Sequence, residues 1–287
     1  MKYIRAQTAA SALQALLHEN GKALIIAGGT DVVVDIQDGK RAPNVLVDIS
    51  SALDMRGIAV EGNELVIGAT VTFAEIVKSP IVKQYFPSIC KAASKMGSTQ
   101  IRNLATLAGN IVTANPEADV AMAIAPLAPK AVVLSESGTQ TVLVENLYAG
   151  VGASRIDPSK EVIKEIRIPL SAPGDAVSYI RLALRNSLTP PILNVAAMLH
   201  YSEGKVEWAR IAMGPVGIGP VRAKEAEMFL AGKPLTKENA AKAGELALKN
   251  ADIVGNPIRG SIVYQAQVLP VLVRRALEDI AAQLGVV

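Results

Sequence analysis

GSTQIRNLATLAGNIVTANPEAD, residues 97–119, is the most informative stretch of this 287-residue chain. Small and polar residues dominate it: two glycines, three threonines, one serine and four Asn or Gln side chains. Its apolar residues predict at most two short strand-like pieces; they are Ile101, Leu104, Leu107, Ile111 and Val112. Because glycine lacks a Cβ, backbone here can approach a ligand closely, and successive N–H groups can form an anion-binding concavity. The composition fits either such a site or an irregular loop between a helix and a strand.

A second small-residue turn lies upstream. Residues 23–26 are apolar and predict a buried strand, which runs directly into AGGTD at 27–31. This turn is not a Walker loop, because no Gly-Lys-Ser/Thr follows it. It is not the dinucleotide fingerprint either, because the third glycine is missing and no clear helix follows. Two such turns in one chain favour a long diphosphate ligand that backbone groups hold from two sides.

AGGTD (27–31) together with QIRNLATLAGN…NPEAD (100–119) resembles the flavoprotein subunit of the molybdenum hydroxylases. That family includes the FAD subunits of bacterial xanthine, nicotinate and carbon monoxide dehydrogenases. The resemblance covers the whole chain, since the segments between and after the two turns follow in the family's order: LVDIS (46–50), LVIGATVTFAEI (65–76) and IKEIRIP (163–169).

The resemblance implies an α+β fold in two domains. Residues 1–170 would form a two-lobed FAD-binding domain of the vanillyl-alcohol-oxidase/PCMH type, with lobes at about 1–55 and 56–170. Residues 175–287 would form a CO-dehydrogenase-flavoprotein-like C-terminal domain, with a three-stranded antiparallel sheet and a helical bundle. The linker at 169–174 contains two prolines and a glycine, which suits a domain boundary.

Hydrophobic periodicity, turn residues and breakers place the individual elements. Helices are expected at 8–20, 72–78, 89–96, 120–127, 221–230, 237–250 and 261–284. Strands are expected at 23–26, 44–49, 58–60, 64–68, 130–135, 139–144, 161–168, 178–184, 192–201 and 206–213. Residues 32–36 are expected to form a strand or a buried turn of helix.

The turn at 27–31 suits the pyrophosphate of FAD. Backbone N–H groups can hydrogen-bond phosphate oxygens, and the Thr30 hydroxyl adds a donor. A carboxylate cannot serve phosphate directly, so Asp31 is better suited to hold its own turn. The family's contact segment maps onto Ile25, Ile26, Ala27, Gly28, Gly29, Thr30, Asp31 and Val32.

Residues 97–119, called the second stretch below because they follow the turn at 27–31 in the chain, supply the other contacts that the resemblance implies. Thr106, Gly109, Asn110 and Thr113 match pyrophosphate and flavin contacts of the family. Asp119 matches a further FAD contact, and its carboxylate is suited to accept a hydrogen bond from a ribose or ribityl hydroxyl. The alternative role for Asp119 is the N-cap of the helix expected from residue 120.

Three more contacts follow from aligning strands with the family. Met96 falls where some relatives place an aromatic beside the flavin, and Ile163 falls at an apolar backbone contact. Arg181 falls where some relatives have a lysine near the isoalloxazine. A cation there would favour the anionic reduced flavin and raise its potential. The alternative for Arg181 is a charge on the sheet surface.

The chain departs from the family pattern at two places. Ala108 stands where glycine usually precedes Gly109-Asn110. A positive φ there would cost about 1 kcal/mol or more, and a negative φ would still leave a methyl group beside the ligand. LTPP (188–191) replaces a segment that is acidic in relatives, which would change access to the far face of the flavin.

Composition narrows the function classes. A formal charge of +3 gives no basis for a nucleic-acid-binding face. One cysteine and two histidines leave no disulfide, no Cys-ligated cluster and no expected metal site. The longest apolar stretch is about half a membrane span, and the first residues lack a secretory signal, so a cytoplasmic protein is expected.

The resemblance implies electron transfer. A molybdenum-cofactor large subunit would oxidise the organic substrate, and a [2Fe-2S] small subunit would carry electrons to FAD in this chain. NAD, a quinone or oxygen would then accept them. No catalytic side chain is expected here, because the flavin carries the chemistry. A mean hydropathy of +0.31 fits an obligate complex. The alternatives are a self-contained flavin-dependent reductase of the same fold and an FAD-free scaffold subunit.

Overall fold

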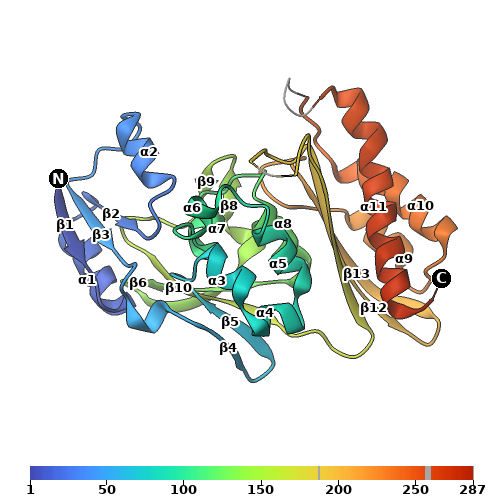
Figure 1. The fold of residues 1–287 in the computed structure, drawn as a ribbon, viewed down its shortest axis with the longest axis horizontal. Helices are drawn as coiled ribbons and strands as arrows, with labels where there is room; N and C mark the ends of the chain where they lie inside the picture. Colours follow the sequence, from blue (N-terminus) through green and yellow to red (C-terminus); the bar gives the residue numbers. More distant parts are fainter. Residues whose placement is uncertain (187, 256–259, 287) are drawn as a thin grey trace.

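The computed structural model describes residues 1–186, 188–255 and 260–286. The chain forms three units in a row, and the two termini lie at opposite ends of the molecule (Figure 1). It has the expected α+β architecture: a small N-terminal lobe, a central lobe and a C-terminal sheet covered by helices. No helix of the described residues is long and apolar enough to cross a bilayer.

The N-terminal lobe is built on a three-stranded parallel sheet. Its strands β1 (Lys2–Arg5), β2 (Ala23–Ile26) and β3 (Val45–Asp48) have the order β1-β3-β2. Every residue of the central strand β3 is buried, as expected for a parallel strand covered on both faces. Parallel neighbours need crossover connections; α1 (Ala9–His18) and α2 (Val32–Gln37) lie in the two connections.

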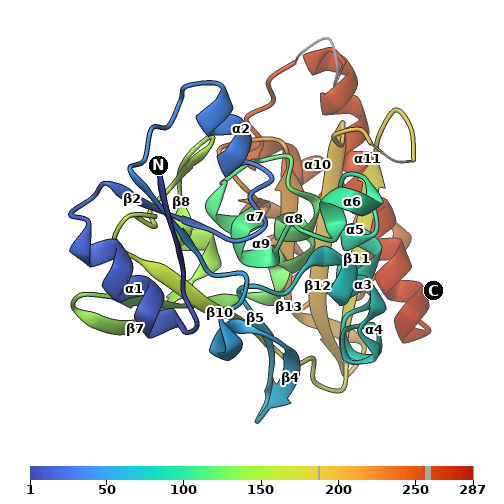
Figure 2. The ribbon, with the colours of Figure 1, turned by 60° about the vertical axis from the view of Figure 1, so that its left-hand side comes forward.

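The central lobe holds a five-stranded antiparallel sheet of order β4-β5-β10-β6-β7. Its strands are β4 (Ile58–Glu61), β5 (Glu64–Gly68), β6 (Lys130–Ser135), β7 (Gly138–Leu143) and β10 (Val162–Pro169). Two predicted hairpins pair as expected, β4 with β5 and β6 with β7, and β10 lies between them. Helices α3 (Phe73–Lys78), α4 (Pro80–Tyr85) and α5 (Pro87–Ala93) lie beside this sheet, toward the C-terminal unit (Figures 1 and 2).

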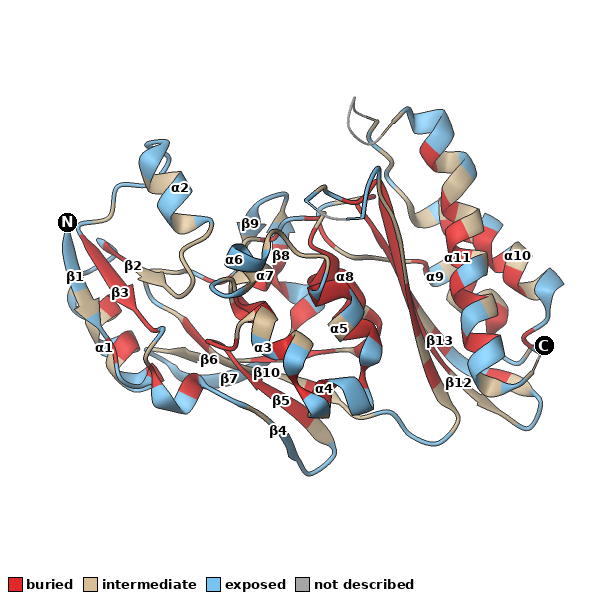
Figure 3. Cartoon of the chain, viewed as in Figure 1, coloured by how far each residue is buried: buried red, intermediate tan, exposed pale blue. Residues whose placement is uncertain are grey.

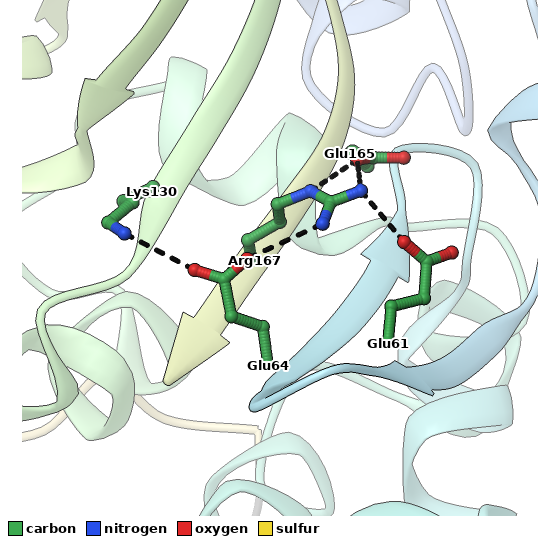
Figure 4. A network of polar contacts seen from close by, with 5 residues as sticks. All are labelled: Glu61, Glu64, Lys130, Glu165 and Arg167. Atoms are coloured by element: carbon green, nitrogen blue, oxygen red, sulfur yellow. Dashed lines mark hydrogen bonds and ion pairs between the residues drawn. The ribbon is translucent and has the colours of Figure 1, made fainter. Parts of the chain in front are cut away.

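One face of β10 carries a network of charges around Arg167 (Figure 4). The guanidinium contacts Glu165 at 2.6 Å, Glu61 at 2.9 Å and Glu64 at 3.4 Å. Lys130 lies 3.2 Å from Glu64 and extends the network onto β6. Strand alternation explains the location, because Ile166 and Ile168 point to the buried face. The network therefore joins strands that are distant in the sequence without entering the core.

The C-terminal unit is an antiparallel sheet with helices on one face. The strands are β11 (Asp175–Leu182), β12 (Leu193–Ser202), β13 (Lys205–Gly214) and β14 (Val221–Arg222). The helices are α9 (Lys224–Leu230), α10 (Lys237–Ala247) and α11 (Ile262–Leu284). Gly244 lets α10 approach α11 closely, since a Cβ there would lie 2.4 Å from the carbonyl oxygen of Pro270.

Both faces are buried in the middle of this sheet, along most of β12 and the second half of β13 (Figure 3). Val195, Ala197 and Met213 belong to a core shared with α9–α11. Alternate residues such as Ala196 and Met198 belong to the larger core that extends through the central lobe. β10 ends at Pro169 and β11 begins at Asp175, on either side of the predicted domain boundary. The C-terminal sheet is thus also a wall of the central lobe.

Several expected elements differ from the structure. The C-terminal sheet has four strands instead of three, because Val221 and Arg222 pair with β13 and α9 starts only at Lys224. The helix expected at 89–96 runs from Pro87 to Ala93. The prediction also lacks β1, α4, β8 (Tyr148–Gly150) and β9 (Ala153–Ser154), all of which are short. Residues 32–36 are helical, but no residue of α2 is buried.

Candidate functional site

A cavity of about 480 Å³ lies where the three units meet. The turn after β2, much of residues 96–119, the approach to β10 and residues 188–191 all line it. Fourteen of the sixteen predicted cofactor contacts are in its wall: Ile25, Ala27, Gly28, Gly29, Thr30, Asp31, Val32, Met96, Thr106, Gly109, Asn110, Thr113, Asp119 and Ile163. Ile26 and Arg181 do not line it.

The turn at 27–31 packs directly on the second stretch. A Cβ at Gly28 would lie 1.9 Å from the carbonyl oxygen of Leu104, so only glycine fits there. Gly29 has a φ of +70°, which also favours glycine. Contrary to expectation, a helix does follow the turn, because α2 starts at Val32.

Unpaired backbone donors gather in this turn. Within the part of the chain that the structure describes, the N–H groups of residues 28–31 donate to no protein acceptor. The Thr30 hydroxyl donates to the Asp31 carboxylate at 3.4 Å, but that carboxylate does not cap α2, so a bond from Asp31 to the backbone of its own turn is not seen among the described residues. Burial raises the pKa of the Asp31 carboxyl, and the Thr30 hydroxyl opposes that shift. The turn therefore offers backbone donors to an anionic group in the cavity.

Residues 97–119 contain two short helices, α6 (Thr99–Arg102) and α7 (Leu107–Val112), instead of the expected strand-like pieces. The helix expected at 120–127 is present as α8 (Asp119–Ile124), followed by a 3-10 turn at Ala125–Leu127. Ser98 caps α6 by accepting from the Ile101 N–H at 3.2 Å. Thr106 caps α7 by accepting from the Gly109 N–H at 3.0 Å. The capping residues were the missed signal, because a Ser or Thr at the N-cap satisfies a donor that a short helix leaves open.

Ala108 is accommodated without backbone strain. It lies inside α7 and has a negative φ, so the cost considered for a positive φ does not arise. Its side chain is buried and lines the cavity. The methyl group therefore shapes the wall next to Gly109.

Asn110 carries an unpaired polar atom into the same wall. Its Oδ1 is buried and has no partner among the described residues. Its main-chain carbonyl is occupied, since it accepts from the Thr113 hydroxyl at 2.9 Å. A buried amide oxygen without a partner is costly unless a ligand or water satisfies it. This orphaned atom and the free N–H groups of 28–31 fit a polar, phosphate-bearing cofactor.

Asp119 has a different role from the alternative considered. The N-cap of α8 is Ala118 and no side chain caps that helix, so Asp119 is not an N-cap. Its carboxylate is 5% exposed and accepts from the Tyr179 hydroxyl at 2.5 Å. The Arg181 Nε lies 3.0 and 3.1 Å from its two oxygens, and Asn194 donates at 3.3 Å.

Arg181 is not a surface charge. Its side chain is 8% exposed, and besides Asp119 it donates through Nη2 to the carbonyl oxygen of Thr189 at 2.5 Å. Tyr179 and Asn194 were missed by the sequence reasoning. A Tyr-x-Arg pair on one strand was the available signal, because residues two apart share a face.

Four further charged groups were also missed. Lys95, Glu117 and Glu161 line the cavity alongside the predicted residues. Arg102 donates to the carbonyl oxygens of Met96 at 2.9 Å and Gly97 at 3.0 Å, and so holds the start of the stretch. Among the described residues, no group of three or more His, Cys, Asp or Glu could hold a metal ion.

Comparisons with known proteins agree with this geometry. The family described as "FAD binding domain in molybdopterin dehydrogenase" matches residues 1–171, and "CO dehydrogenase flavoprotein C-terminal domain" matches residues 178–280. The nicotinate dehydrogenase FAD-subunit of Eubacterium barkeri is 32% identical over 263 residues, which cover 91% of this chain and 88% of that protein. The xanthine dehydrogenase FAD-binding subunit of Escherichia coli O157:H7 is 27% identical, covering 99% and 97%.

Solved structures show the same relationship. The carbon monoxide dehydrogenase of Hydrogenophaga pseudoflava contains a chain that superposes with a TM-score of 0.91 at 28% identity, covering 98% of this chain and 97% of that one. Quinoline 2-oxidoreductase of Pseudomonas putida 86 gives a TM-score of 0.90 at 25% identity, covering 100% and 98%. The chain therefore belongs to the FAD-binding medium subunits of the molybdenum hydroxylase family, and it is an oxidoreductase subunit whose cofactor is FAD.

Proposed function

We propose that this chain is the electron-transfer subunit of a molybdenum-containing hydroxylase or dehydrogenase. When bound, FAD would supply the redox chemistry, taking electrons from a [2Fe-2S] small subunit and passing them to NAD, a quinone or oxygen. The single observation that carries the proposal is the cavity in which the unpaired N–H groups of 28–31 and the orphaned Oδ1 of Asn110 meet.

The chain's own residues would bind and orient the cofactor. We assign the N–H groups of Gly28, Gly29, Thr30 and Asp31 to the pyrophosphate, because they are unpaired and line the cavity. Asn110 would bond a further polar group through its free amide oxygen. Met96 and Ile163 would provide apolar contact in the wall. The remaining predicted residues that line the cavity would pack against the cofactor.

The partners belong to the same proposal. Relatives of this chain are named as the medium chain of carbon monoxide dehydrogenase and as subunit alpha of the 6-hydroxypseudooxynicotine dehydrogenase complex. By likeness we propose a molybdenum-cofactor large subunit and a [2Fe-2S] small subunit as partners, in the cytoplasm. With one cysteine, this chain cannot supply the four thiolates of a typical [2Fe-2S] cluster, so the cluster of the proposed relay would lie in another chain.

The test is anaerobic reduction of the FAD-loaded chain. Nicotinate, purines and aldehydes are added to the chain alone and to the complex purified from the native host. We expect loss of flavin absorbance only in the complex, for one of these substrate classes. Bleaching of the chain alone would refute the relay and favour the self-contained reductase. A purified chain that binds no FAD would favour the scaffold, a reading that the unstrained Ala108 no longer supports.

A further inference from the structure

Polar side chains from two strands of the C-terminal sheet converge on one carboxylate, that of Asp119. Tyr179 and Arg181 lie two residues apart on β11, and Arg181 is directly opposite Asn194 on β12. Residues in these positions share one face of a sheet. All three side chains donate to the Asp119 carboxylate, which stands at the start of α8. The C-terminal unit thus reaches the cofactor cavity through Asp119, which lines it.

The guanidinium of Arg181 forms hydrogen bonds with two different parts of the chain. Its Nε bonds both oxygens of Asp119, while its Nη2 bonds the carbonyl oxygen of Thr189. Thr189 belongs to residues 188–191, all of which line the cavity. We call these four residues the wall segment. One buried guanidinium therefore connects Asp119, which lines the cavity, to the wall segment.

The Asp119 carboxylate neutralises the positive charge of Arg181, so that little of this charge is left to act on a ligand. The side chains of Arg181 and Asp119 are 8% and 5% exposed, and a buried ion of this kind is tolerated only when paired. Asp119 Oδ1 has three donors within hydrogen-bond distance, whereas Oδ2 has, among the described residues, only the Arg181 Nε, whose single hydrogen it shares with Oδ1. A carboxylate oxygen accepts about two hydrogen bonds, so Oδ2 has room for one ligand donor.

We propose that Arg181 is a positioning residue for the electron-transfer reaction. It fixes the Asp119 carboxylate for one donor of the cofactor and holds the wall segment over the cavity, so that it limits access of small molecules to the bound flavin. It does not act as a cation facing the flavin. This inference rests on the proposed function where it concerns electron transfer. The contacts of Arg181 with Asp119 and Thr189 do not depend on which molecules donate and accept the electrons.

Lysine is the informative replacement. Arg181→Lys keeps the charge but replaces the rigid guanidinium fork, whose Nε and Nη2 reach Asp119 and Thr189 separately, by one ammonium on a flexible stem that cannot occupy both nitrogen positions. The wall segment would lose its buried anchor while the ion pair persists. Arg185→Lys is the matched control, because Arg185 Nη2 donates to the carbonyl oxygen of Leu188 in the same segment and the side chain is exposed.

The measurement is iodide quenching of flavin fluorescence in the FAD-loaded full chain, together with FAD affinity, melting temperature and flavin potential. For Arg181→Lys we expect the quenching constant to rise at least three-fold, FAD affinity to change less than three-fold, and the potential to stay unchanged. The control should match wild type. A merely structural role would lower the melting temperature and leave quenching unchanged, and that result would overturn the proposal.

Two other outcomes would overturn it as well. Loss of FAD from folded Arg181→Lys would make Arg181 a direct cofactor ligand. A lowered potential in the folded double variant Asp119→Asn/Arg181→Gln would show that Arg181 acts as an uncompensated cation. If Arg181→Lys does not fold, Pro190→Gly decides, since loosening the wall segment must raise quenching by a similar factor. Quenching needs only bound FAD, so its result is separate from the partner-driven bleaching that tests the relay.

Discussion

Two arginines in this molecule hold charge networks of opposite character. Arg167 lies among Glu61, Glu64 and Glu165, and its side chain is 27% exposed (Figure 4). Arg181 meets a single carboxylate, Asp119, and is 8% exposed. Water has access to Arg167 from its exposed side, whereas both members of the Arg181–Asp119 pair are almost fully buried. The number of ion pairs is therefore a poor guide to their importance, and burial is the better one.

The largest expected effect is at the buried arginine. Arg181→Met leaves the Asp119 carboxylate buried without its counter-ion, and breaking such a pair costs about 3–5 kcal/mol. Urea unfolding should show this loss of stability relative to wild type. Arg181→Met/Asp119→Asn should recover part of it, because the uncompensated charge is then gone. A loss below about 1 kcal/mol would mean that water reaches Asp119 and that the two networks do not differ in kind.

The next effect concerns Tyr179, which donates to the same carboxylate. Tyr179→Phe should cost about 2 kcal/mol, the value of a hydrogen bond to a charged group. Burial, and then the charge of Asp119, hold the pKa of Tyr179 well above its usual value of 10.0. The unfolded chain therefore loses this proton first, and wild type should lose stability as the pH rises above about 10. Denaturant midpoints between pH 8 and 11 should fall more steeply for wild type than for Tyr179→Phe.

A smaller effect is expected at the cofactor. Asn110→Ala removes the orphaned Oδ1 and with it the hydrogen bond to FAD that we propose for it, which should weaken FAD binding about tenfold. Fluorescence titration of the apo chain measures it. Gln140→Ala is a suitable control, because that amide is exposed on β7. Equal affinity in both variants would remove Asn110 from the cofactor contacts.

The smallest effect is expected at the exposed network. Arg167→Met should lower the free energy of unfolding by less than about 1 kcal/mol, because water screens and replaces its partners. The difference should shrink further in 1 M NaCl, and FAD affinity should be unchanged. A cost as large as that of Arg181→Met would contradict the comparison, and would show that the network on β10 acts as a unit.

Much of the fold could be predicted because its signals are local. β5 and β10 show alternating or continuous apolar patterns bounded by turn residues, and α11 shows helical spacing over many turns. The errors fall where helices are short. α6 and α7 are too short for periodicity to reveal them, and they depend on the caps Ser98 and Thr106. A single Ser or Thr is weak evidence until its backbone partner is known.

The sequence by itself determined the family and located the small-residue turn at 27–31 that lines the cavity. Gly28-Gly29-Thr30 after a buried strand, and Thr106 to Thr113 in the second stretch, are local patterns whose chemistry is fixed by residue type. Only the tertiary structure decided what Asp119 and Arg181 do. Asp119 meets partners that lie 60, 62 and 75 residues away in the chain. Such contacts depend on the register of β11 against β12 and on how their sheet packs on α8, and no local pattern encodes that packing.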